Sequence, residues 1–285
     1  MNANLPFFYY NSFMISLDEI VKHALEEDRA FNDVTTGFVV DPEKRGRAHA
    51  IAKSEGIMAG GWVSEKVFLT LDPELSFTQT KREGEAFKKG EILFYVEGRV
   101  SSILKAERVA LNFLQRLCGI ATTTSKFVMA VKGTGVKIMD TRKTTPLLRT
   151  LEKYAVRAGG GMNHRFDLEE MVLIKENHIT AAGSIREAIR RAKKSGKFVE
   201  VEVKNIEELK VVLEEGASRV MLDNFSLEDI KKAVDMAKGK IEIEVSGGVK
   251  LENVRKLAET GVDMISIGYL THSFTASDIS LILEG

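Results

Sequence analysis

From Val136 to Gly268 the sequence repeats one pattern, which is a short apolar run, a loop and an amphipathic helix. The candidate strands are VKIMD (136–140), MVLIK (171–175), FVEVEV (198–203), RVMLD (219–223), IEIEVSGG (241–248) and MISIG (264–268). Helical stretches separate them, and several end in glycine, the usual C-cap. Repeated βα units predict a parallel sheet. The tight spacing of the last units favours a barrel over an open doubly wound sheet, which would carry a glycine-rich dinucleotide turn.

Two of these strands carry glutamates at alternate positions. Glu200 and Glu202 share one face of FVEVEV, and Glu242 and Glu244 share one face of IEIEV. A barrel strand packs its outer face on helices, so the intervening apolar residues belong outside and the glutamates line the interior. The alternative is an antiparallel strand with one solvated face, which the flanking helices make less favourable.

The first 132 residues have a different character, in which helices flank a block of β sequence. Ser16 is placed to cap a helix that begins at Leu17. We predict short strands within 47–57 and 75–98, a turn at 33–36 (DVTT), and helices at 101–118 and at about 124–132.

Composition excludes several classes of function. The 41 Lys and Arg balance the 41 Asp and Glu, whereas a nucleic-acid binder would show a basic excess. The lone Cys118 excludes an internal disulfide and a multi-cysteine metal site, and indicates a reducing, cytoplasmic compartment. Its apolar helical context favours an inert core thiol over chemistry. No stretch approaches the ~18 apolar residues of a membrane helix. The aromatic start, MNANLPFFYYNSFMIS, is a poor signal peptide and is interpreted as an arm that docks on the body or on a neighbouring subunit.

In barrels of this kind the functional residues lie at the C-terminal ends of the strands and in the loops that follow. Those positions hold Asp140-Thr141-Arg142-Lys143, Lys175-Glu176-Asn177-His178, Glu202, Asp223-Asn224, Ser246-Gly247-Gly248 and Gly268. Cations and exposed backbone N–H groups bind phosphate, and carboxylates suit Mg²⁺ or sugar hydroxyls. The combination predicts a substrate rich in phosphate, with a metal.

The segment 141–165 concentrates positive charge, with six Lys or Arg and one His against one acid. Thr145-Pro146 predicts a helix start and the glycines at 159–161 its end. On that helix Arg149, Lys153 and Arg157 form one stripe, which we interpret as a solvated or interface face.

The residues on either side of this helix can meet. Extended GGGMNHR is just long enough to return along the helix, so Arg142, Lys143, His164 and Arg165 can converge on one mouth. Such a group suits a small polyanion with more than one carboxylate, because Arg pairs bidentately with carboxylates. His164 taken alone fits a structural histidine equally well, and its neighbours favour ligand contact.

These residues resemble the quinolinate phosphoribosyltransferase family, also called nicotinate-nucleotide pyrophosphorylase (carboxylating). The resemblance begins at about Glu19 and rests on ERVALNFLQRLCGIAT, DTRKTTPLLRTLEKYAVRAGGGMNHRFDL, LIKENHI, VEVEV, VMLDNF, EVSGGV and ISIGYLTHS. It implies an α/β protein with an N-terminal α/β sandwich domain over residues 1–120 and an incomplete α/β barrel, the catalytic domain, over 121–274. A C-terminal tail, 275–285, would pack back on the N-terminal domain.

The resemblance also implies a pentosyltransferase reaction. Quinolinate and phosphoribosyl pyrophosphate (PRPP) would react with Mg²⁺ to give nicotinate mononucleotide, pyrophosphate and CO₂, a step of de novo NAD biosynthesis. Members of the family are dimers or larger homo-oligomers in which an arginine of one subunit completes the neighbour's site. The implied partners are these small molecules and a second copy of the chain, with no nucleic acid and no membrane.

The implied site residues form three groups. The carboxylates of quinolinate would meet Arg142, His164, Arg165, Lys175 and, from the neighbouring subunit, Arg108. The phosphates of PRPP would meet Lys143, Ser246, Gly247, Gly248 and Gly268. The ribose hydroxyls or Mg²⁺, the latter directly or indirectly, would be held by Glu202 and Asp223, which with Lys143 and Lys175 form the catalytic group.

The chain departs from the family pattern at Tyr269, where a smaller residue is expected, and in its aromatic N-terminal arm. Three alternatives stay open. A sister enzyme of the same fold would act on another ring carboxylate. A phosphate-binding lyase or isomerase barrel would need a Schiff-base lysine, with which Lys175 beside Glu202 is compatible. A non-catalytic nucleotide sensor is disfavoured by the presence of Lys143, Glu202 and Asp223.

Overall fold

The computed structural model describes residues 15–285, so the predicted N-terminal arm lies almost wholly outside the described residues. The chain divides into two compact units. The barrel unit comprises Thr124–Thr144 and Gly160–Ser273. The N-terminal unit comprises the described residues up to Thr123 together with Thr145–Gly159 and Phe274–Gly285.

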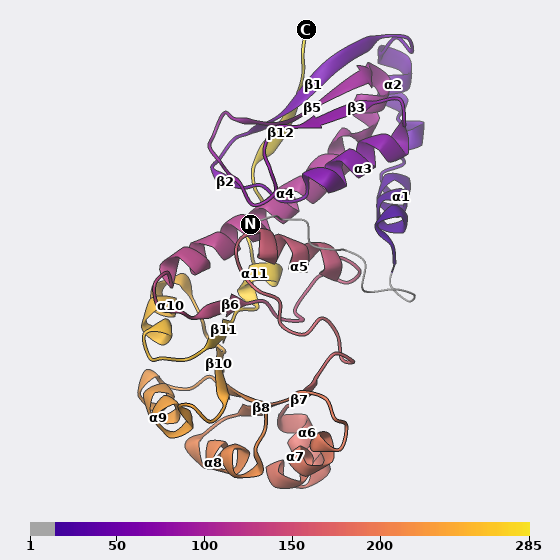
Figure 1. The fold of residues 1–285 in the computed structure, drawn as a ribbon. Coiled ribbons are helices and arrows are strands. Elements are labelled where there is room, and N and C mark those ends of the chain that lie inside the picture. Colours follow the sequence, from indigo (N-terminus) through magenta and orange to yellow (C-terminus); the bar gives the residue numbers. More distant parts are fainter. Residues whose placement is uncertain (1–14) are drawn as a thin grey trace. The chain divides into compact units, whose positions relative to one another are not determined.

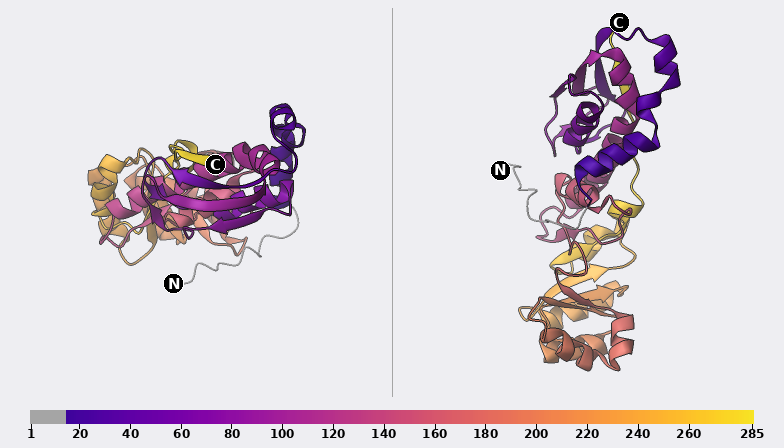
Figure 2. Two further views of the ribbon diagram at one scale, coloured as in Figure 1. Left: turned by 90° about the horizontal axis from the view of Figure 1, so that it is seen from above. Right: turned by 90° about the vertical axis from the view of Figure 1, so that its right-hand side faces the viewer.

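The barrel unit is built on a six-stranded parallel sheet in the order β6-β11-β10-β9-β8-β7. Its strands are β6 (Lys137–Met139), β7 (Val172–Ile174), β8 (Val199–Val203), β9 (Arg219–Asp223), β10 (Glu242–Ser246) and β11 (Met264–Ser266). Its helices are α6 (Glu176–Ala182), α7 (Ile185–Lys193), α8 (Ile206–Glu215), α9 (Leu227–Ala237), α10 (Leu251–Ala258) and α11 (Tyr269–His272). Strands β6 and β7 form the two edges, so the barrel is incomplete, and helices cover the outside of the curved sheet (Figures 1 and 2).

The two faces of the strands separate as their alternation predicts. Val199, Val201 and Val203 are buried on the helical side of β8. Glu200 and Glu244 are also fully buried, but on the inner side, where both contact the ring of His164. The prediction that the glutamates line the barrel interior is therefore confirmed for these two positions.

The N-terminal unit contains a four-stranded antiparallel sheet in the order β12-β1-β5-β3. The strands of this sheet are β1 (Arg45–Ala52), β3 (Ser76–Gln79), β5 (Ile92–Arg99) and β12 (Ile279–Leu283). Two short strands, β2 (Gly56–Ile57) and β4 (Ala86–Phe87), pair separately. Its helical segments are α1 (Leu17–Glu27), η1 (Ala30–Asn32), α2 (Val34–Val39), α3 (Gly61–Leu71), α5 (Arg149–Ala158) and the first part of α4 (Val100–Ala130). Ser16 caps α1 in a capping box with Glu19, as predicted.

Three local predictions, two of helix bounds and one of a turn, are wrong. The segments predicted as separate helices, 101–118 and about 124–132, belong to one continuous helix, α4, which ends at Ala130. DVTT (33–36), predicted as a turn, is the start of helix α2. Asp33 caps this helix, and its side chain accepts the N–H groups of Thr35 and Thr36. Helix α5 begins at Arg149 and not at Thr145-Pro146.

The predicted stripe on α5 does not lie wholly in solvent. Lys153, in its middle, is only 2% exposed. Its neighbour Glu152 is fully buried and accepts hydrogen bonds from the guanidinium of Arg116 on α4 and from the N–H of Thr145. This carboxylate therefore ties the start of α5 to α4 within the N-terminal unit.

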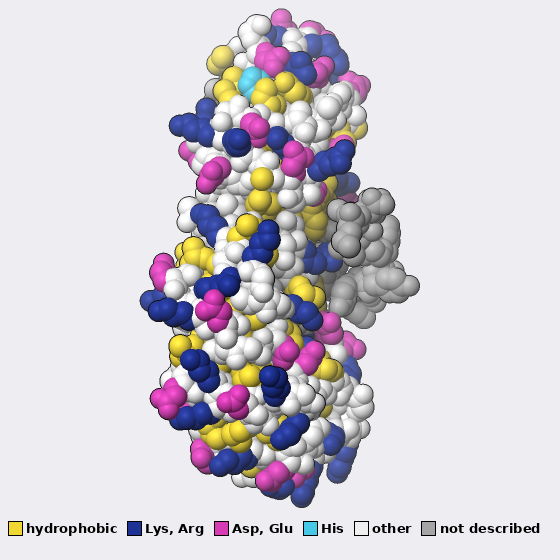
Figure 3. All heavy atoms as spheres, turned by 60° about the vertical axis from the view of Figure 1, so that its left-hand side comes forward, with side chains coloured by type: hydrophobic (Ala, Val, Ile, Leu, Met, Phe, Trp, Pro, Cys, Tyr) yellow, Lys and Arg dark blue, Asp and Glu magenta, His cyan; other side chains and the backbone are white. Residues whose placement is uncertain are grey.

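Cys118 is buried, and its sulfur lies within hydrogen-bond distance of both the N–H and the carbonyl of Ala59. Burial raises the pKa of the thiol to about 12, which fits an inert core residue. On the face drawn in Figure 3, basic and acidic side chains are interspersed rather than segregated. Among the described residues, no helix is both long enough and apolar enough to span a bilayer.

Candidate active site at the carboxyl ends of the barrel strands

The strand-like segment at Met162 returns along the free edge of β6. Met162 forms a parallel bridge with Met139, and its carbonyl accepts the N–H of Asp140 at 3.0 Å. The buried carboxylate of Asp140 then accepts the N–H of His164 at 2.9 Å and the amide of Asn163 at 2.5 Å. This pairing fixes the loop that carries His164 and Arg165 beside the end of β6, next to Arg142.

Two arginines meet at this point. Arg165 is 7% exposed, and burial followed by the nearby charge of Arg142 lowers its pKa below the ordinary value. The Nε of Arg142 is buried and makes no hydrogen bond to any described residue. One Nη of Arg165 donates to the carbonyl of Met171 at 3.1 Å. In the part of the chain that the structure describes, no carboxylate forms an ion pair with either guanidinium, so both guanidinium groups are suited to bind an anionic ligand.

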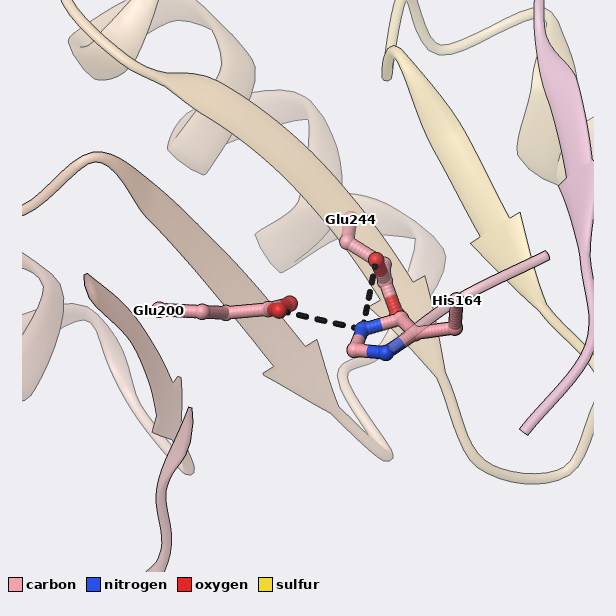
Figure 4. Close-up of side chains that lie close together, drawn as sticks. All are labelled: His164, Glu200 and Glu244. Carbon is pink, nitrogen blue, oxygen red and sulfur yellow. Dashed lines mark hydrogen bonds and ion pairs between the residues drawn. The ribbon is translucent and has the colours of Figure 1, made fainter. Parts of the chain in front are cut away.

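The imidazole of His164 points into the barrel, between two buried carboxylates (Figure 4). Its Nε2 lies 3.0 Å from Glu200 and 3.5 Å from Glu244. Its Nδ1 accepts the backbone N–H of Arg165 at 2.7 Å. Burial lowers the pKa of His164, but the hydrogen bond to Glu200 and the charges of Glu244 and Glu200 outweigh it and raise the pKa above 6.5.

Lys175 and two carboxylates lie on consecutive strands. The ammonium group of Lys175, just after β7, donates to Glu202 on β8. Asp223 ends β9, and its carboxylate accepts the side-chain amide of Asn224 at 3.0 Å. Glu202 and Asp223 are both partly exposed, so each keeps acceptor capacity for a ligand at this edge.

The glycine turn after β10 packs against Asn224. Gly247 has φ 88°, and a Cβ there would lie 2.2 Å from the side-chain oxygen of Asn224. Asn224 itself has φ 56° and donates its N–H to the carbonyl of Ser246. The turn therefore needs glycine both for conformation and for space, and the following Gly248 also has a positive φ, 60°.

The second glycine turn follows β11. A Cβ on Gly268 would lie 2.9 Å from the Cδ of Lys143, and the hydroxyl of Thr271 donates to the carbonyl of Lys143 at 2.8 Å. Lys143 is exposed at this turn. The ring of Tyr269 lies against Phe127, with centroids 6.4 Å apart.

The barrel unit thus holds all of the predicted site residues except Arg108, which is exposed on α4 in the N-terminal unit. Three further residues support the site: Asp140 anchors the returning loop, Asn224 supports the glycine turn, and Arg219 lies 3.8 Å from Glu200 and 3.7 Å from Glu244. Arg219 could have been found from the sequence. It lies on β9, between the strands that carry Glu200 and Glu244, and two buried carboxylates require a positive charge between them.

Sequence profiles of two domains match the chain. The quinolinate phosphoribosyl transferase N-terminal domain matches residues 33–118, and the C-terminal domain of the same family matches residues 120–282. A probable nicotinate-nucleotide pyrophosphorylase [carboxylating] from Bacillus subtilis is 40% identical over 270 residues, which cover 94% of this chain and 93% of the relative.

Solved structures agree with this. The nicotinate-nucleotide pyrophosphorylase of Ehrlichia chaffeensis has a TM-score of 0.91 and 40% identity, covering 95% of this chain and 100% of that one. The enzyme of the same name from Francisella tularensis has a TM-score of 0.89 and 40% identity, covering 96% and 100%. With both domain profiles matched and relatives this similar along nearly the whole length, the chain belongs to the quinolinate phosphoribosyltransferase family.

Proposed function

We propose that the protein transfers the phosphoribosyl group of PRPP to quinolinate, with decarboxylation, to give nicotinate mononucleotide, pyrophosphate and CO₂ in NAD biosynthesis. The observation that carries this proposal is the pair formed by Arg142 and Arg165. Two like charges brought together under burial are unfavourable until an anion joins them. Quinolinate has two adjacent carboxylates and matches the pair, whereas a monocarboxylate leaves one guanidinium without a partner.

The reaction needs orientation and charge placement more than a strong base. The pyridine nitrogen attacks the ribose carbon, forming a C–N bond as the C–O bond to pyrophosphate breaks. The ring nitrogen is then positively charged, so the ring carbon beside it can hold the electron pair left when CO₂ departs, and that carbon takes up a proton. Holding the two reactants in line and placing charges against the leaving group both lower the barrier in such a mechanism.

Individual side chains have assigned roles in this proposal. Arg142, Arg165 and Lys175 bind the carboxylates of quinolinate, and His164 supports them. Lys143, at the Gly268 turn, stabilises charge that develops on the leaving pyrophosphate. The glycine turn Ser246-Gly247-Gly248 offers backbone N–H groups to the 5′-phosphate.

Glu202 and Asp223 fit a magnesium site. They are carboxylates on neighbouring strands, both partly exposed at the carboxyl edge of the sheet, and Mg²⁺ prefers a few carboxylates together with water and substrate phosphates. A bound Mg²⁺ would neutralise the pyrophosphate. The same carboxylates can hold the ribose hydroxyls and stabilise positive charge at the ribose carbon, while Lys175 keeps Glu202 in place.

A second copy of the chain completes the site in this proposal, with Arg108 supplied by the neighbouring subunit of a homodimer or larger assembly. The exposure of Arg108 on α4 supports this. We further propose a cytoplasmic location, which the lone reduced cysteine supports.

The test is to incubate the protein with PRPP and Mg²⁺, with quinolinate in one reaction and nicotinate in the other, and to measure mononucleotide and CO₂. Product and CO₂ from quinolinate alone are expected. Product from nicotinate, or from neither acid, would contradict the proposal and favour a sister enzyme acting on another ring carboxylate.

A matched pair of variants tests the two arginines. Arg165→Lys keeps the charge but loses the planar fork that binds a carboxylate bidentately. We expect kcat/KM for quinolinate to fall about 100-fold, the equivalent of ~3 kcal/mol, with KM for PRPP nearly unchanged. Arg157→Lys, on the exposed end of α5, is the control and should leave both constants unaffected. Equal effects of the two variants would remove the arginine pair from the site.

A further inference from the structure

The reaction proposed above leaves a group of buried charges without a role. Glu200 and Glu244 are both fully buried inside the barrel, and Arg219 lies within 4 Å of each. One oxygen of Glu200 and both oxygens of Glu244 make no hydrogen bond to any described residue. Burying carboxylates that are incompletely paired costs stability, so their presence requires an explanation.

The contacts of His164 determine where its proton lies. Because the N–H of Arg165 donates to Nδ1, at 2.7 Å, the neutral ring must carry its proton on Nε2. That Nε2–H then donates to the carboxylate of Glu200 at 3.0 Å. The inner face of the barrel is thus connected, through one imidazole, to the main chain of a proposed substrate-binding arginine.

The same contacts argue against a metal ion. One donor atom from each of His164, Glu200 and Glu244 lies within 4.8 Å of the others, as metal ligands would. However, the Nε2 that faces the carboxylates holds the proton, and Nδ1 is already engaged by Arg165. Arg219 also supplies a positive charge beside both carboxylates. The arrangement therefore needs no metal ion, and the role that remains for it is to orient the imidazole.

We propose that Glu200 is a positioning residue for the loop that carries His164 and Arg165. Its carboxylate accepts the Nε2–H of His164 and so holds the ring pointing inward. In that orientation Nδ1 accepts the backbone N–H of Arg165. This inference rests on the proposed function and deepens it, because it assigns the placement of Arg165 to a residue that never touches substrate. Glu244 and Arg219 hold Glu200 from the next two strands.

Every element packed around the ring contributes to this geometry. Glu200 comes from β8, Arg219 from β9 and Glu244 from β10. From the end of β6, Asp140 holds the main chain of His164 itself, and Arg165 follows it in the sequence. The orientation of the ring is thus determined from four strands, which is how a binding group is held rigidly.

The first experiment compares two substitutions of Glu200. Glu200→Met keeps the volume but removes the acceptor, whereas Glu200→Gln retains an oxygen that can accept the Nε2–H. We expect KM for quinolinate to rise at least tenfold in Glu200→Met, with kcat and KM for PRPP within about threefold of the unsubstituted protein. Glu200→Gln should stay within about threefold in all three constants.

Glu242→Gln is the control, because Glu242 also pairs with Arg219 but lies on the exposed end of β10. It should change none of the constants. Equal losses in Glu200→Gln and Glu200→Met would overturn the proposal, because they would assign the effect to charge and not to the acceptor. A rise of both KM values together, or of neither, would overturn it as well.

A second measurement needs no variant and no substrate, so it tests the contact independently of the proposed function. The chain has five histidines, and ¹⁵N spectra of their rings distinguish the two neutral tautomers. We expect His164, at a pH above its raised pKa, to carry the proton on Nε2 with Nδ1 unprotonated. The opposite tautomer would overturn the proposal even if quinolinate is the substrate. If His164 has the expected tautomer but the protein does not use quinolinate, the proposed function alone is wrong and the contact with Glu200 stands.

Discussion

Leu147 occupies a backbone conformation that its side chain disfavours. It has φ 67° and is 69% exposed, between Pro146 and the start of α5. A left-handed conformation costs an L-residue about 1–2 kcal/mol, whereas glycine adopts it freely. No apolar burial of comparable size compensates, because most of the side chain is in water.

We therefore predict that Leu147→Gly leaves the stability unchanged or raises it by up to about 1 kcal/mol, after the larger entropy of glycine in the unfolded chain is subtracted. The control is Leu168→Gly, because Leu168 is 70% exposed but is not among the residues with positive φ. That substitution should destabilise by about 0.5–1 kcal/mol. Urea unfolding of the two variants measures the difference, and equal losses would show that Leu147 is unstrained.

Glu244 makes stability depend on pH. Burial, and then the charge of Glu200, raise its pKa from 4.5 to about 7. Between these values the folded protein keeps a proton that the unfolded chain has lost. The stabilising contribution of the protonated group is therefore complete below pH 4.5 and is lost as pH rises to 7.

Glu244→Gln removes this titration. Relative to the unsubstituted protein, the variant should gain stability as pH rises from 5 to 8, by an amount on the order of 3 kcal/mol. Denaturant unfolding at the two pH values gives the quantity, with Glu242→Gln as the exposed control. A difference that does not change with pH would mean that Glu244 is ionised throughout.

At the scale of elements, two variants can separate the two reasons why the turn after β10 needs glycine, which are its backbone conformation and the space beside it. In Gly247→Ala the new side chain is strained by a positive φ of 88° and also collides with the side chain of Asn224. In Gly239→Ala only the positive φ of 72° is unfavourable, because no atom lies within 4 Å of the new Cβ. Gly239→Ala should destabilise by about 1 kcal/mol, and Gly247→Ala by about 2 kcal/mol or more, because overpacking adds to the cost of the backbone conformation.

Of the two variants, only Gly247→Ala should also raise KM for PRPP, by about tenfold or more. A methyl group at this position collides with the side chain of Asn224, so the turn proposed to bind phosphate must move to admit it. Steady-state kinetics with PRPP varied measures this. Unaltered KM for PRPP in Gly247→Ala would exclude the turn from phosphate binding.

The strands were the most predictable elements. Each of the six candidate strands from Val136 onward became a strand of the barrel sheet. Four of them are short apolar runs, as expected for strands buried on both faces, and two alternate apolar residues with glutamate. The alternating glutamates also predicted the interior correctly at Glu200 and Glu244.

Helix boundaries were less predictable, because they depend on partners distant in sequence. Gly119 lies inside α4, where a Cβ would come within 2.4 Å of the carbonyl of Thr275, so that glycine marks close packing and not a helix end. Thr145-Pro146 has the composition of a helix start, but the N–H of Thr145 is taken by the buried Glu152, and the helix begins later.

The candidate site was predictable in its residues but not in their contacts. Residue types at strand ends indicated cations, carboxylates and glycine turns. The approach of the two arginines was expected from the length of the segment that returns along the helix. The inward direction of His164 and the part of Arg219 depend on the curvature of the sheet and on pairing across strands, which no local pattern contains.

At the scale of the whole molecule, a shared active site can be detected by mixing two inactive proteins. Arg108→Ala and Lys143→Ala remove groups that, in the proposed assembly, reach one site from different subunits. Subunit exchange between them should restore activity to about a quarter of that of the unsubstituted protein for a symmetric dimer, because one site in four then contains both residues. Mixing each variant with itself is the control. A mixture that stays inactive after demonstrated exchange would place both residues in the same subunit.

The pairing of β12 with β1 joins two segments that lie far apart in the chain. Residues 279–283 form the edge strand of the N-terminal sheet, while the barrel unit needs nothing beyond Ser273. Strands β1, β3 and β5 are therefore synthesised long before the edge strand that completes their sheet. Until then β1 presents an unpaired edge, which is a site for mispairing with other chains. The pairing with β12 therefore protects an edge that stays open while most of the chain is being made.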